Sequence, residues 1–453
     1  MEYTEFLQRK SQLGGNHGFD PIFMPDYLFD FQKALVEWAI KKGRAAIFAD
    51  CGLGKTPMFL VWAQNVVQKT NGNVLISTPL AVSHQTVREG EKFGIECKRS
   101  DDGKPKGKIT VTNYERLHLF DRHDYVAAVA DESSIVKNFE GVTKALITEF
   151  FRELPYRLLC TATAAPNDYP ELGTSSEVLG ELGYMDMLNR FFKNDQNTSA
   201  LRRFHGQAPK WRMRKHGEKS YWQWVCSWAR AIRRPSDFGF EDGDFVLPPL
   251  MERQHIIDNT EPLPGELFVR PAIGLKEQRD EARMTMRQRC EKVAELVNHN
   301  NPALVWCHLN QEGDLLEKII PDAVQISGSD SDNKKEKTLI DFIEGNIRVL
   351  VTKPKIAGFG LNLQHCAHMT FFPSHSFEQW YQGTRRCWRF GQKKPTTVDM
   401  VTTGGGLSVL ANLQEKSKKA EKMFDNLILY MNESLKIKRT TDYTGEMEAP
   451  TWA

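Results

Sequence analysis

A glycine-rich turn between an apolar run and a helical pattern carries the clearest chemistry in the sequence. The apolar run covers residues 46–49, and the turn reads Gly52-Leu53-Gly54-Lys55-Thr56. Glycines let such a turn curl so that its N–H groups point at phosphate oxygens at the start of a helix. The lysine then reaches the β- and γ-phosphates of ATP, and the following hydroxyl binds Mg²⁺. We therefore predict that the two glycines and Lys55 bind ATP and that Thr56 binds the metal; an ordinary glycine turn before a lysine is the alternative.

Two carboxylates follow a second apolar run. Asp131 and Glu132 come directly after residues 126–130. In open α/β sheets, ligand-binding residues lie at the C-terminal ends of the strands. Phosphoryl transfer from ATP needs one group to hold Mg²⁺ and another to orient the attacking water, and we assign Asp131 to the metal and Glu132 to the water. An acidic pair after a strand is by itself more often a helix cap, but its place downstream of the glycine turn favours the catalytic interpretation.

Two arginines three residues apart occur far downstream, in the segment 382–392. On a helix, Arg386 and Arg389 share one face, so both guanidinium groups can reach the same phosphate. If they come from a separate lobe, they stabilise transition-state charge only when the lobes close. We predict that both are catalytic, and that Arg385, one step round the helix, faces solvent or DNA. The alternative is a basic surface helix.

The elements that position these residues form two series. Short apolar strands that alternate with helical stretches indicate βαβ units and parallel sheets. The candidate strands cover residues 46–49, 74–77, 109–112, 126–130 and 157–160, and then residues 303–307, 323–326, 348–351, 368–372 and 397–401. We therefore predict an α/β protein with two parallel-sheet lobes in tandem. The predicted domains are lobe 1 at 1–169, an insert and linker at 170–285, lobe 2 at 286–437, closed by an amphipathic helix over residues 407–431, and a tail at 438–453.

The predicted insert is basic, rich in aromatic residues and mainly helical. Basic side chains interleaved with tryptophan can clamp the phosphates of a nucleic acid and stack on its bases. We assign Arg212, Arg214 and Lys215 to nucleic acid. The tryptophans of this segment are Trp211, Trp222, Trp224 and Trp228. The last three can equally form the core of a small helical subdomain, and we expect this for about half of them.

Taken in order, these motifs resemble the superfamily-two helicase-like ATPases, in particular the Swi/Snf-like translocases and their compact phage and prophage forms. The further segments that carry the resemblance are Phe29-Asp30-Phe31-Gln32, Thr161-Ala162-Thr163, Gly358-Phe359-Gly360-Leu361-Asn362-Leu363, and residues 382–392, which fit Q-x-x-x-R-x-x-R-x-G-Q. The resemblance implies RecA-like lobes, with Gln32 at the adenine edge and Gly360 at the nucleotide. It also implies that Thr161, Thr163 and Gln382 couple hydrolysis to lobe movement. The nucleic-acid contacts that it implies are at Thr78, Thr112, Thr352 and Lys353.

The chain departs from this family at two places. The family usually has histidine at the fourth position of the Asp-Glu motif, where this chain has Ser134. Its tryptophan-asparagine-proline segment is replaced by Ser374-His375-Ser376-Phe377. We therefore do not predict a nucleosome substrate.

Composition excludes several other classes. The 453 residues are 40% hydrophobic and 26% charged, with a net charge of +2. No apolar run approaches the roughly 18 residues of a membrane span, and the N-terminus has no apolar signal core, so we expect no membrane association and a cytoplasmic protein. The eight cysteines form no CxxC framework, which suits a reducing compartment. The Cys307-His308 pair and the cluster at 365–368 lack the spacing of a zinc finger.

The combined expectation is a motor that uses ATP and Mg²⁺ to move along nucleic acid, for which we predict double-stranded DNA, with little sequence specificity. One alternative is a helicase that separates DNA or RNA strands. Another is a nucleic-acid-binding clamp whose ATPase has decayed. The complete set of catalytic residues, including Lys55 and Glu132, argues against decay.

Overall fold

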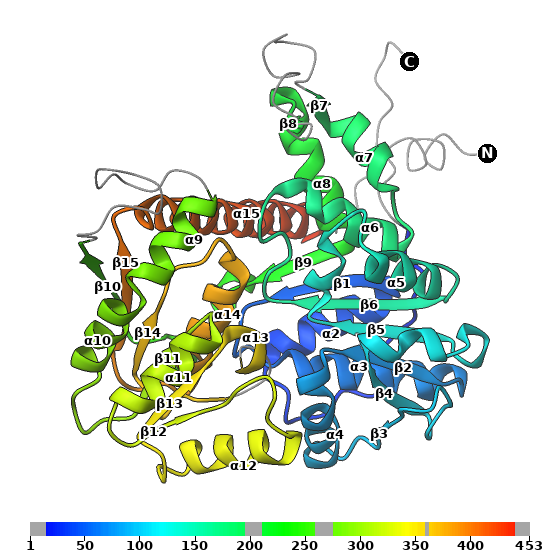
Figure 1. Ribbon diagram of the computed structural model, residues 1–453. Coiled ribbons are helices and arrows are strands. Elements are labelled where there is room, and N and C mark those ends of the chain that lie inside the picture. The colour runs from blue at the N-terminus through cyan, green and yellow to red at the C-terminus, as the bar shows by residue number, and fades with distance from the viewer. Residues whose placement is uncertain (1–14, 195–210, 259–274, 358–361, 440–453) are drawn as a thin grey trace, which may run out of the picture.

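Two parallel β-sheets form the framework of the protein, in a computed structural model that describes residues 15–194, 211–258, 275–357 and 362–439 (Figure 1). Every strand pairing within the two large sheets is parallel. Every strand expected from the sequence is present, with ends shifted by at most a few residues. The predicted α/β architecture of two lobes is therefore confirmed.

The first sheet has the strand order β3-β4-β2-β5-β6-β1-β9. Its strands are β1 (Arg44–Ala49), β2 (Val74–Thr78), β3 (Lys98–Arg99), β4 (Ile109–Asn113), β5 (Ala127–Asp131), β6 (Tyr156–Thr161) and β9 (Ala229–Ile232). The helices of this half are α2 (Asp30–Lys42), α3 (Lys55–Thr70), α4 (Ser83–Lys92), α5 (Val142–Arg152), α6 (Leu172–Leu179), α7 (Tyr184–Phe191) and α8 (Glu218–Trp228). Buried residues of α2 and α3 fill one face of the sheet, and those of α5, α6 and α8 fill the other.

The second sheet has the order β10-β15-β14-β11-β13-β12. Its strands are β10 (Leu250–Ile257), β11 (Ala303–Trp306), β12 (Ala323–Gln325), β13 (Val349–Thr352), β14 (His368–Phe371) and β15 (Thr396–Thr403). The helices of this half are α9 (Leu275–Met284), α10 (Met286–Leu296), α11 (Asn310–Ile319), α12 (Asp332–Ile343), α13 (Pro354–Ala357), α14 (Phe377–Cys387) and α15 (Leu407–Arg439). A two-stranded antiparallel ribbon of β7 (Phe192–Asn194) and β8 (Trp211–Met213) projects beyond the sheets (Figure 1).

The segment between the two series contributes an edge strand to each sheet. β9 pairs with β1, and β10 pairs with β15 over its whole length. The sequence analysis anticipated neither strand. β9 is short and follows α8 without a break, and β10 is a largely exposed edge strand whose sequence LMERQHII contains no continuous apolar run. The segment 170–285 is therefore built into both lobes.

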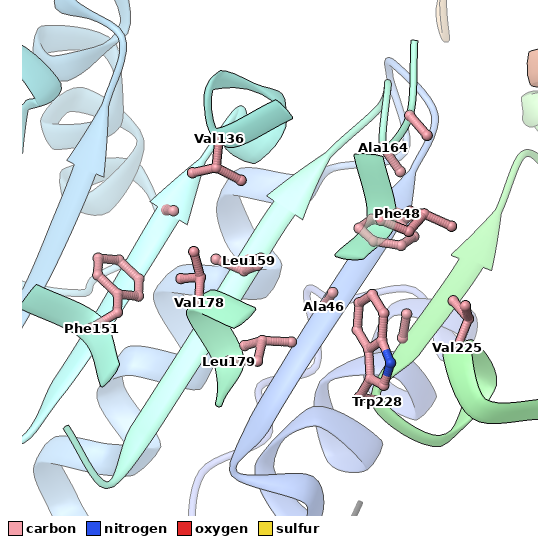
Figure 2. Packing of buried hydrophobic residues seen from close by; sticks show 14 of the residues in the cluster. Ala46, Phe48, Val136, Phe151, Leu159, Ala164, Val178, Leu179, Val225 and Trp228 are labelled. Atoms are coloured by element: carbon pink, nitrogen blue, oxygen red, sulfur yellow. The ribbon is translucent and has the colours of Figure 1, made fainter. Parts of the chain in front are cut away.

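The tryptophans of α8 belong to the hydrophobic core of the first lobe. Trp222 and Trp228 are fully buried and Trp224 is 2% exposed. Figure 2 shows the Trp228 ring against Phe48 of β1, and the two rings meet edge to face with their centroids 6.2 Å apart. All three tryptophans are thus core residues, where the sequence analysis expected about half of them to be.

The long helix α15 belongs to both hydrophobic cores. Near its start, Leu410 and Leu413 pack into the core of the second lobe. Further along, it lies on α8 and β9 and contributes Met423, Phe424, Leu427 and Met431 to the core of the first lobe. The closing helix predicted over residues 407–431 is confirmed, and it extends further than expected. In the described residues, no helix is both long and apolar enough to cross a lipid bilayer.

Replacing Trp228 by alanine tests the core assignment. Trp228→Ala should lower the free energy of unfolding by about 3–5 kcal/mol, because it leaves a cavity beside Phe48. The matched control is Trp211→Ala, since that ring is only partly buried, and the loss there should be about 1–2 kcal/mol. Urea denaturation followed by circular dichroism measures both. Equal losses for the two variants would contradict the assignment.

Candidate active site

The glycine turn connects β1 to α3 in the geometry expected for a phosphate loop. Gly52 and Gly54 have φ values of 92° and 75°, in the left-handed region that favours glycine. A Cβ atom on Gly54 would lie 2.4 Å from Gln32 Nε2, and one on Gly52 would lie 2.9 Å from the backbone nitrogen of Phe390. Lys55 Nζ donates to Ala49 O at 3.0 Å, which folds the lysine back over the turn. Both glycines are therefore required by conformation and by close approach.

The acidic pair lies at the C-terminal end of β5, as expected. Asp131 is 5% exposed, and Tyr114 donates its hydroxyl to the backbone carbonyl of Asp131 at 2.6 Å. Burial and the adjacent Glu132 raise the pKa of Asp131 to about 7, although Lys55 acts in the opposite direction. Glu132 has φ 54°, a left-handed backbone conformation that is strained for a residue with a side chain.

Lys55 lies within the electrostatic field of this acidic pair. Burial lowers its pKa, but the charges of Cys51, Glu132, Asp131 and Asp50 outweigh burial, so the pKa is raised overall. A lysine held in its charged form beside two carboxylates matches what a magnesium nucleotide needs, which is a cation for phosphate and oxygen ligands for the metal. The positions of the glycine turn, Lys55 and the acidic pair therefore fit ATP and Mg²⁺. Thr56, the other residue predicted to bind the metal, is half-buried in the first turn of α3.

The threonines predicted to couple hydrolysis to movement link the acidic pair to the second lobe. Thr161 donates its hydroxyl to Glu132 Oε2 at 3.3 Å and accepts from the Thr163 backbone N–H at 3.0 Å. The Thr163 hydroxyl in turn lies 3.5 Å from Glu378 Oε1, on α14 of the other lobe. The third residue predicted for coupling, Gln382, is 1% exposed on α14 and has no hydrogen-bond partner for its Nε2. The coupling roles of Thr161, Thr163 and Gln382 remain predictions.

Of the two predicted catalytic arginines, Arg389 lies against the glycine turn of the first lobe. Arg386 is in the last turn of α14, but the backbone leaves the helix at Trp388, so the prediction that Arg386 and Arg389 share one helix face was wrong. A Cβ atom added to Gly52 would lie 3.5 Å from Arg389 Cβ, and Arg386 is close enough to Cys51 to act on the pKa of its thiol. Burial lowers the pKa of Arg389, and the like charge of Arg386 lowers it further. Two neighbouring guanidinium groups beside a phosphate-type loop are stabilised by an anion, which a triphosphate supplies.

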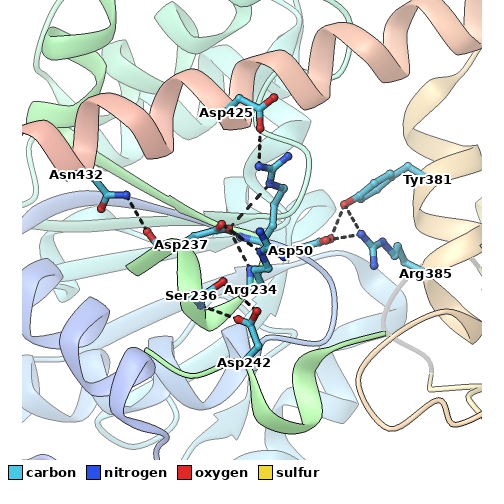
Figure 3. Close-up of polar contacts among 10 residues, drawn as sticks. Asp50, Arg234, Ser236, Asp237, Asp242, Tyr381, Arg385, Asp425 and Asn432 are labelled. Atoms are coloured by element: carbon cyan, nitrogen blue, oxygen red, sulfur yellow. Dashed lines mark hydrogen bonds and ion pairs between the residues drawn. The ribbon is translucent and has the colours of Figure 1, made fainter. Parts of the chain in front are cut away.

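The expectation for Arg385 was wrong. Arg385 is 9% exposed and faces the first lobe, where its Nη2 lies 2.5 Å from Asp50 Oδ2 (Figure 3). The hydroxyl of Tyr381 donates to the same carboxylate. The guanidinium also lies over the rings of Tyr381 and Trp388, at 5.2 Å and 4.2 Å from their centroids. A buried carboxylate at the end of β1 therefore holds Arg385 away from solvent and DNA.

Gln32 contacts the glycine turn directly. Its Nε2 donates to Leu53 O at 2.8 Å, and its Oε1 accepts from the Phe29 backbone N–H at 3.0 Å. The nitrogen and the oxygen of the Gln32 side-chain amide thus both form hydrogen bonds within the protein. The role of Gln32 toward adenine stays a prediction. Beside it, Phe29 and Phe31 meet Phe245 edge to face, and the ring of Phe245 stacks on Phe390 of the second lobe at 4.5 Å. The sequence analysis missed this cluster, because its rings come from three distant segments.

The residues predicted to touch nucleic acid are divided between buried and exposed positions. The side chains of Thr78, Thr112 and Thr352 are fully buried at strand ends, and Lys353 Nζ contacts Asn310. Contacts to a nucleic acid from these loops would therefore come from backbone groups and neighbouring side chains. The exposed members are Arg212, Arg214 and Lys215, at and just after β8. Arg214 also donates to two backbone carbonyls, of Phe192 and Asn189, which fix the base of the ribbon.

Gly360 lies outside the described residues. The absence of a zinc site at the cysteine and histidine residues stays a prediction. Among the described residues, no group of three or more His, Cys, Asp or Glu side chains that could hold a metal ion is found.

A separate cavity of about 610 Å³ lies between the lobes. It is lined by residues 162–166, α14 and α15, and by no residue of the glycine turn. It is therefore not the nucleotide site, although Arg385 and Thr163 border it.

Comparisons with known proteins add little to this description. The sequence matches no protein-family profile and no curated protein. Among solved structures, the chain is similar to the Sulfolobus solfataricus SWI2/SNF2 ATPase core in complex with dsDNA, with 16% identity and a TM-score of 0.42 over 93% of this chain and 98% of that chain. A similarity this distant carries no conclusion about the activity of this chain.

Breaking the Asp50–Arg385 pair tests its role in holding the lobes together. Asp50→Asn should lower the free energy of unfolding by about 3 kcal/mol, because it leaves Arg385 buried without a counter-charge. The control is Glu336→Gln, since Glu336 forms an exposed pair with Arg88 of the other lobe, and its loss should be below about 1 kcal/mol. Urea titration measures both. A loss for Asp50→Asn no larger than for the control would contradict the assignment.

Proposed function

We propose that this protein is an ATP- and Mg²⁺-dependent motor that moves along double-stranded DNA with little sequence specificity. The observation that carries the proposal is the close approach of Arg389 and Phe390, from the second lobe, to Gly52 in the glycine turn of the first, with Arg386 three residues before Arg389. A nucleotide bound at Lys55 would be enclosed by groups from both lobes. Hydrolysis would then require the lobes to be closed, which is the requirement for coupling it to movement.

The chain's own residues divide the chemistry between them. When bound, MgATP supplies the phosphoryl group and the metal charge that offsets the phosphates. Lys55 and the N–H groups of the turn bind the phosphates, and Thr56 and Asp131 provide oxygen ligands for the metal. Glu132 orients the attacking water and accepts its proton. The two arginines stabilise the charge that develops on the transferred group.

The nucleic-acid side of the proposal rests on charge and on the motif order. Arg212, Arg214 and Lys215 present basic side chains on the ribbon, and contacts of this kind bind phosphates without reading bases. The choice of double-stranded DNA follows from the resemblance of the motifs to Swi/Snf-like translocases. The proposal that the protein is of the compact phage and prophage type rests on the same resemblance. We place the protein in the cytoplasm on the composition of the sequence.

The deciding experiment measures ATP turnover with and without nucleic acid. Turnover should be low for the protein alone and rise at least about tenfold with duplex DNA of any sequence, because the arginines act only in the closed state. Single-stranded DNA and RNA serve as comparison ligands. Displacement of a triplex strand without unwinding of a forked duplex is the expected result for a translocase. Equal turnover with and without every nucleic acid would reject the motor, and stimulation by RNA alone would reject the DNA substrate.

Two substitutions separate binding from catalysis. Lys55→Ala should abolish turnover and weaken ATP binding, because it removes a phosphate contact that exists before reaction. Glu132→Gln should lower turnover by about 100-fold or more and leave ATP binding nearly unchanged, because water orientation matters only in the transition state. Fluorescent-nucleotide titration measures binding, and a coupled assay measures turnover. Near-normal turnover of Glu132→Gln would show that Glu132 is not the catalytic carboxylate.

A further inference from the structure

One carboxylate of the second lobe contacts three residues of the first. Glu378 lies in the first turn of α14, with its side chain 14% exposed. Its Oε1 accepts from the Ser134 hydroxyl at 2.5 Å and lies 3.5 Å from the Thr163 hydroxyl. Its Oε2 forms an ion pair with Lys137. The sequence analysis assigned no role to this residue.

These three partners belong to two segments that adjoin the proposed catalytic carboxylate, Glu132. Ser134 and Lys137 belong to the short helix η4 (Ser133–Lys137), which begins directly after Glu132. Thr163 is joined through Thr161 to the carboxylate of Glu132 itself. Glu378 thus touches the segment that follows Glu132 and the segment that binds its side chain. A shift of either segment relative to α14 breaks at least one of its contacts.

The same helix is fixed to the first lobe at a second point. Glu378, Tyr381 and Arg385 are spaced i, i+3 and i+7, which places them on one face of α14. Tyr381 and Arg385 bind Asp50, beside the glycine turn. The two contact points lie at opposite ends of the helix that carries Arg386. The position of α14 therefore depends on two parts of the first lobe. One is the glycine turn, and the other is the segment of residues 131–137 at the end of β5, here called the acidic loop.

We propose that Glu378 is a positioning residue that couples the docking of α14 to the conformation of the acidic loop, so that Arg386 and Glu132 reach their working positions together. The inference rests on the ATP-hydrolysing function proposed above. It also accounts for Ser134, which stands where the resembling family usually has histidine. In this chain the Ser134 hydroxyl donates to Glu378 on the opposite lobe.

The test is steady-state ATP turnover of the full chain with saturating duplex DNA. Glu378→Ala and Glu378→Gln should each lower kcat by about tenfold and change KM for ATP by less than about twofold, which is the size expected for coupling through a contact network. The exchange variant Lys137→Glu with Glu378→Lys restores the ion pair in the opposite sense, and Ser134 can accept from the new ammonium group. The exchange variant should recover at least about half of the loss in kcat, when that loss is expressed as a logarithm.

The matched control is Glu336→Gln, which removes another ion pair between the lobes, with Arg88. That pair is exposed and lies on α4 and α12, so kcat should stay within about twofold of the parent chain. Glu378→Gln keeps the shape of the side chain, so it gives a result even if the alanine variant fails to fold.

Three results would overturn the inference. The first is a Glu378→Gln variant whose kcat stays within about twofold of the parent value. The second is an exchange variant no better than its two single changes. The third is a loss of ATP affinity in parallel with kcat, which would indicate a general structural role. A parent chain that shows no ATP turnover with any nucleic acid would reject the proposed function and this inference together, whereas an active parent with unaffected Glu378 variants would reject the inference alone.

Discussion

The ion pair between Asp50 and Arg385 is the interaction on which the arrangement of the site depends. Both groups are buried, and a buried charge is tolerated only when it is paired and hydrogen-bonded. Asp50 follows β1 directly and begins the glycine turn, whereas Arg385 immediately precedes Arg386. Because each charge has its partner on the other lobe, separating the lobes leaves both without a counter-charge. The pair therefore specifies which part of the second lobe meets the phosphate loop.

Much of this fold could be predicted from the sequence, for a physical reason. Strands buried on both faces of a parallel sheet are continuous apolar runs, as in β5, and the residues of the glycine turn and the acidic pair follow such runs directly. The contacts of Arg385 and Glu378 could not be predicted in this way. The partners of Arg385 and Glu378 are more than 200 positions away in the sequence. From the sequence alone, both residues are expected to be exposed polar residues of an amphipathic helix. β10 was missed for a related reason, since an exposed edge strand has no apolar pattern to reveal it.

The helix α15 limits how the lobes can move. Its first turns are packed in the core of the second lobe and its later turns in the core of the first, and it is tied there by polar contacts as well (Figure 3). Asn432 donates to the backbone carbonyl of Asp237 at 3.3 Å, and Arg233 pairs with Asp425 at 2.6 Å. Complete separation of the lobes would expose the apolar side chains of one end of this helix. A rotation that keeps both ends packed exposes none of them, so hinge motion about α15 is the less costly movement.

The charges of the interface explain how a nucleotide would bias that motion. Closing the lobes buries Arg389 against the glycine turn of the first lobe. That burial, with the like charge of Arg386 three residues earlier on the same lobe, lowers the pKa of Arg389, so keeping Arg389 charged there is costly. In the structure, this cost is opposed by the contacts of Asp50 with Arg385 and of Glu378 with Lys137. An anion bound between the arginines and Lys55 would remove the repulsion and bind more tightly to the closed arrangement than to an open one. A ligand shifts a conformational equilibrium only by such a difference in affinity, so binding of ATP would favour closure and loss of the γ-phosphate would weaken it.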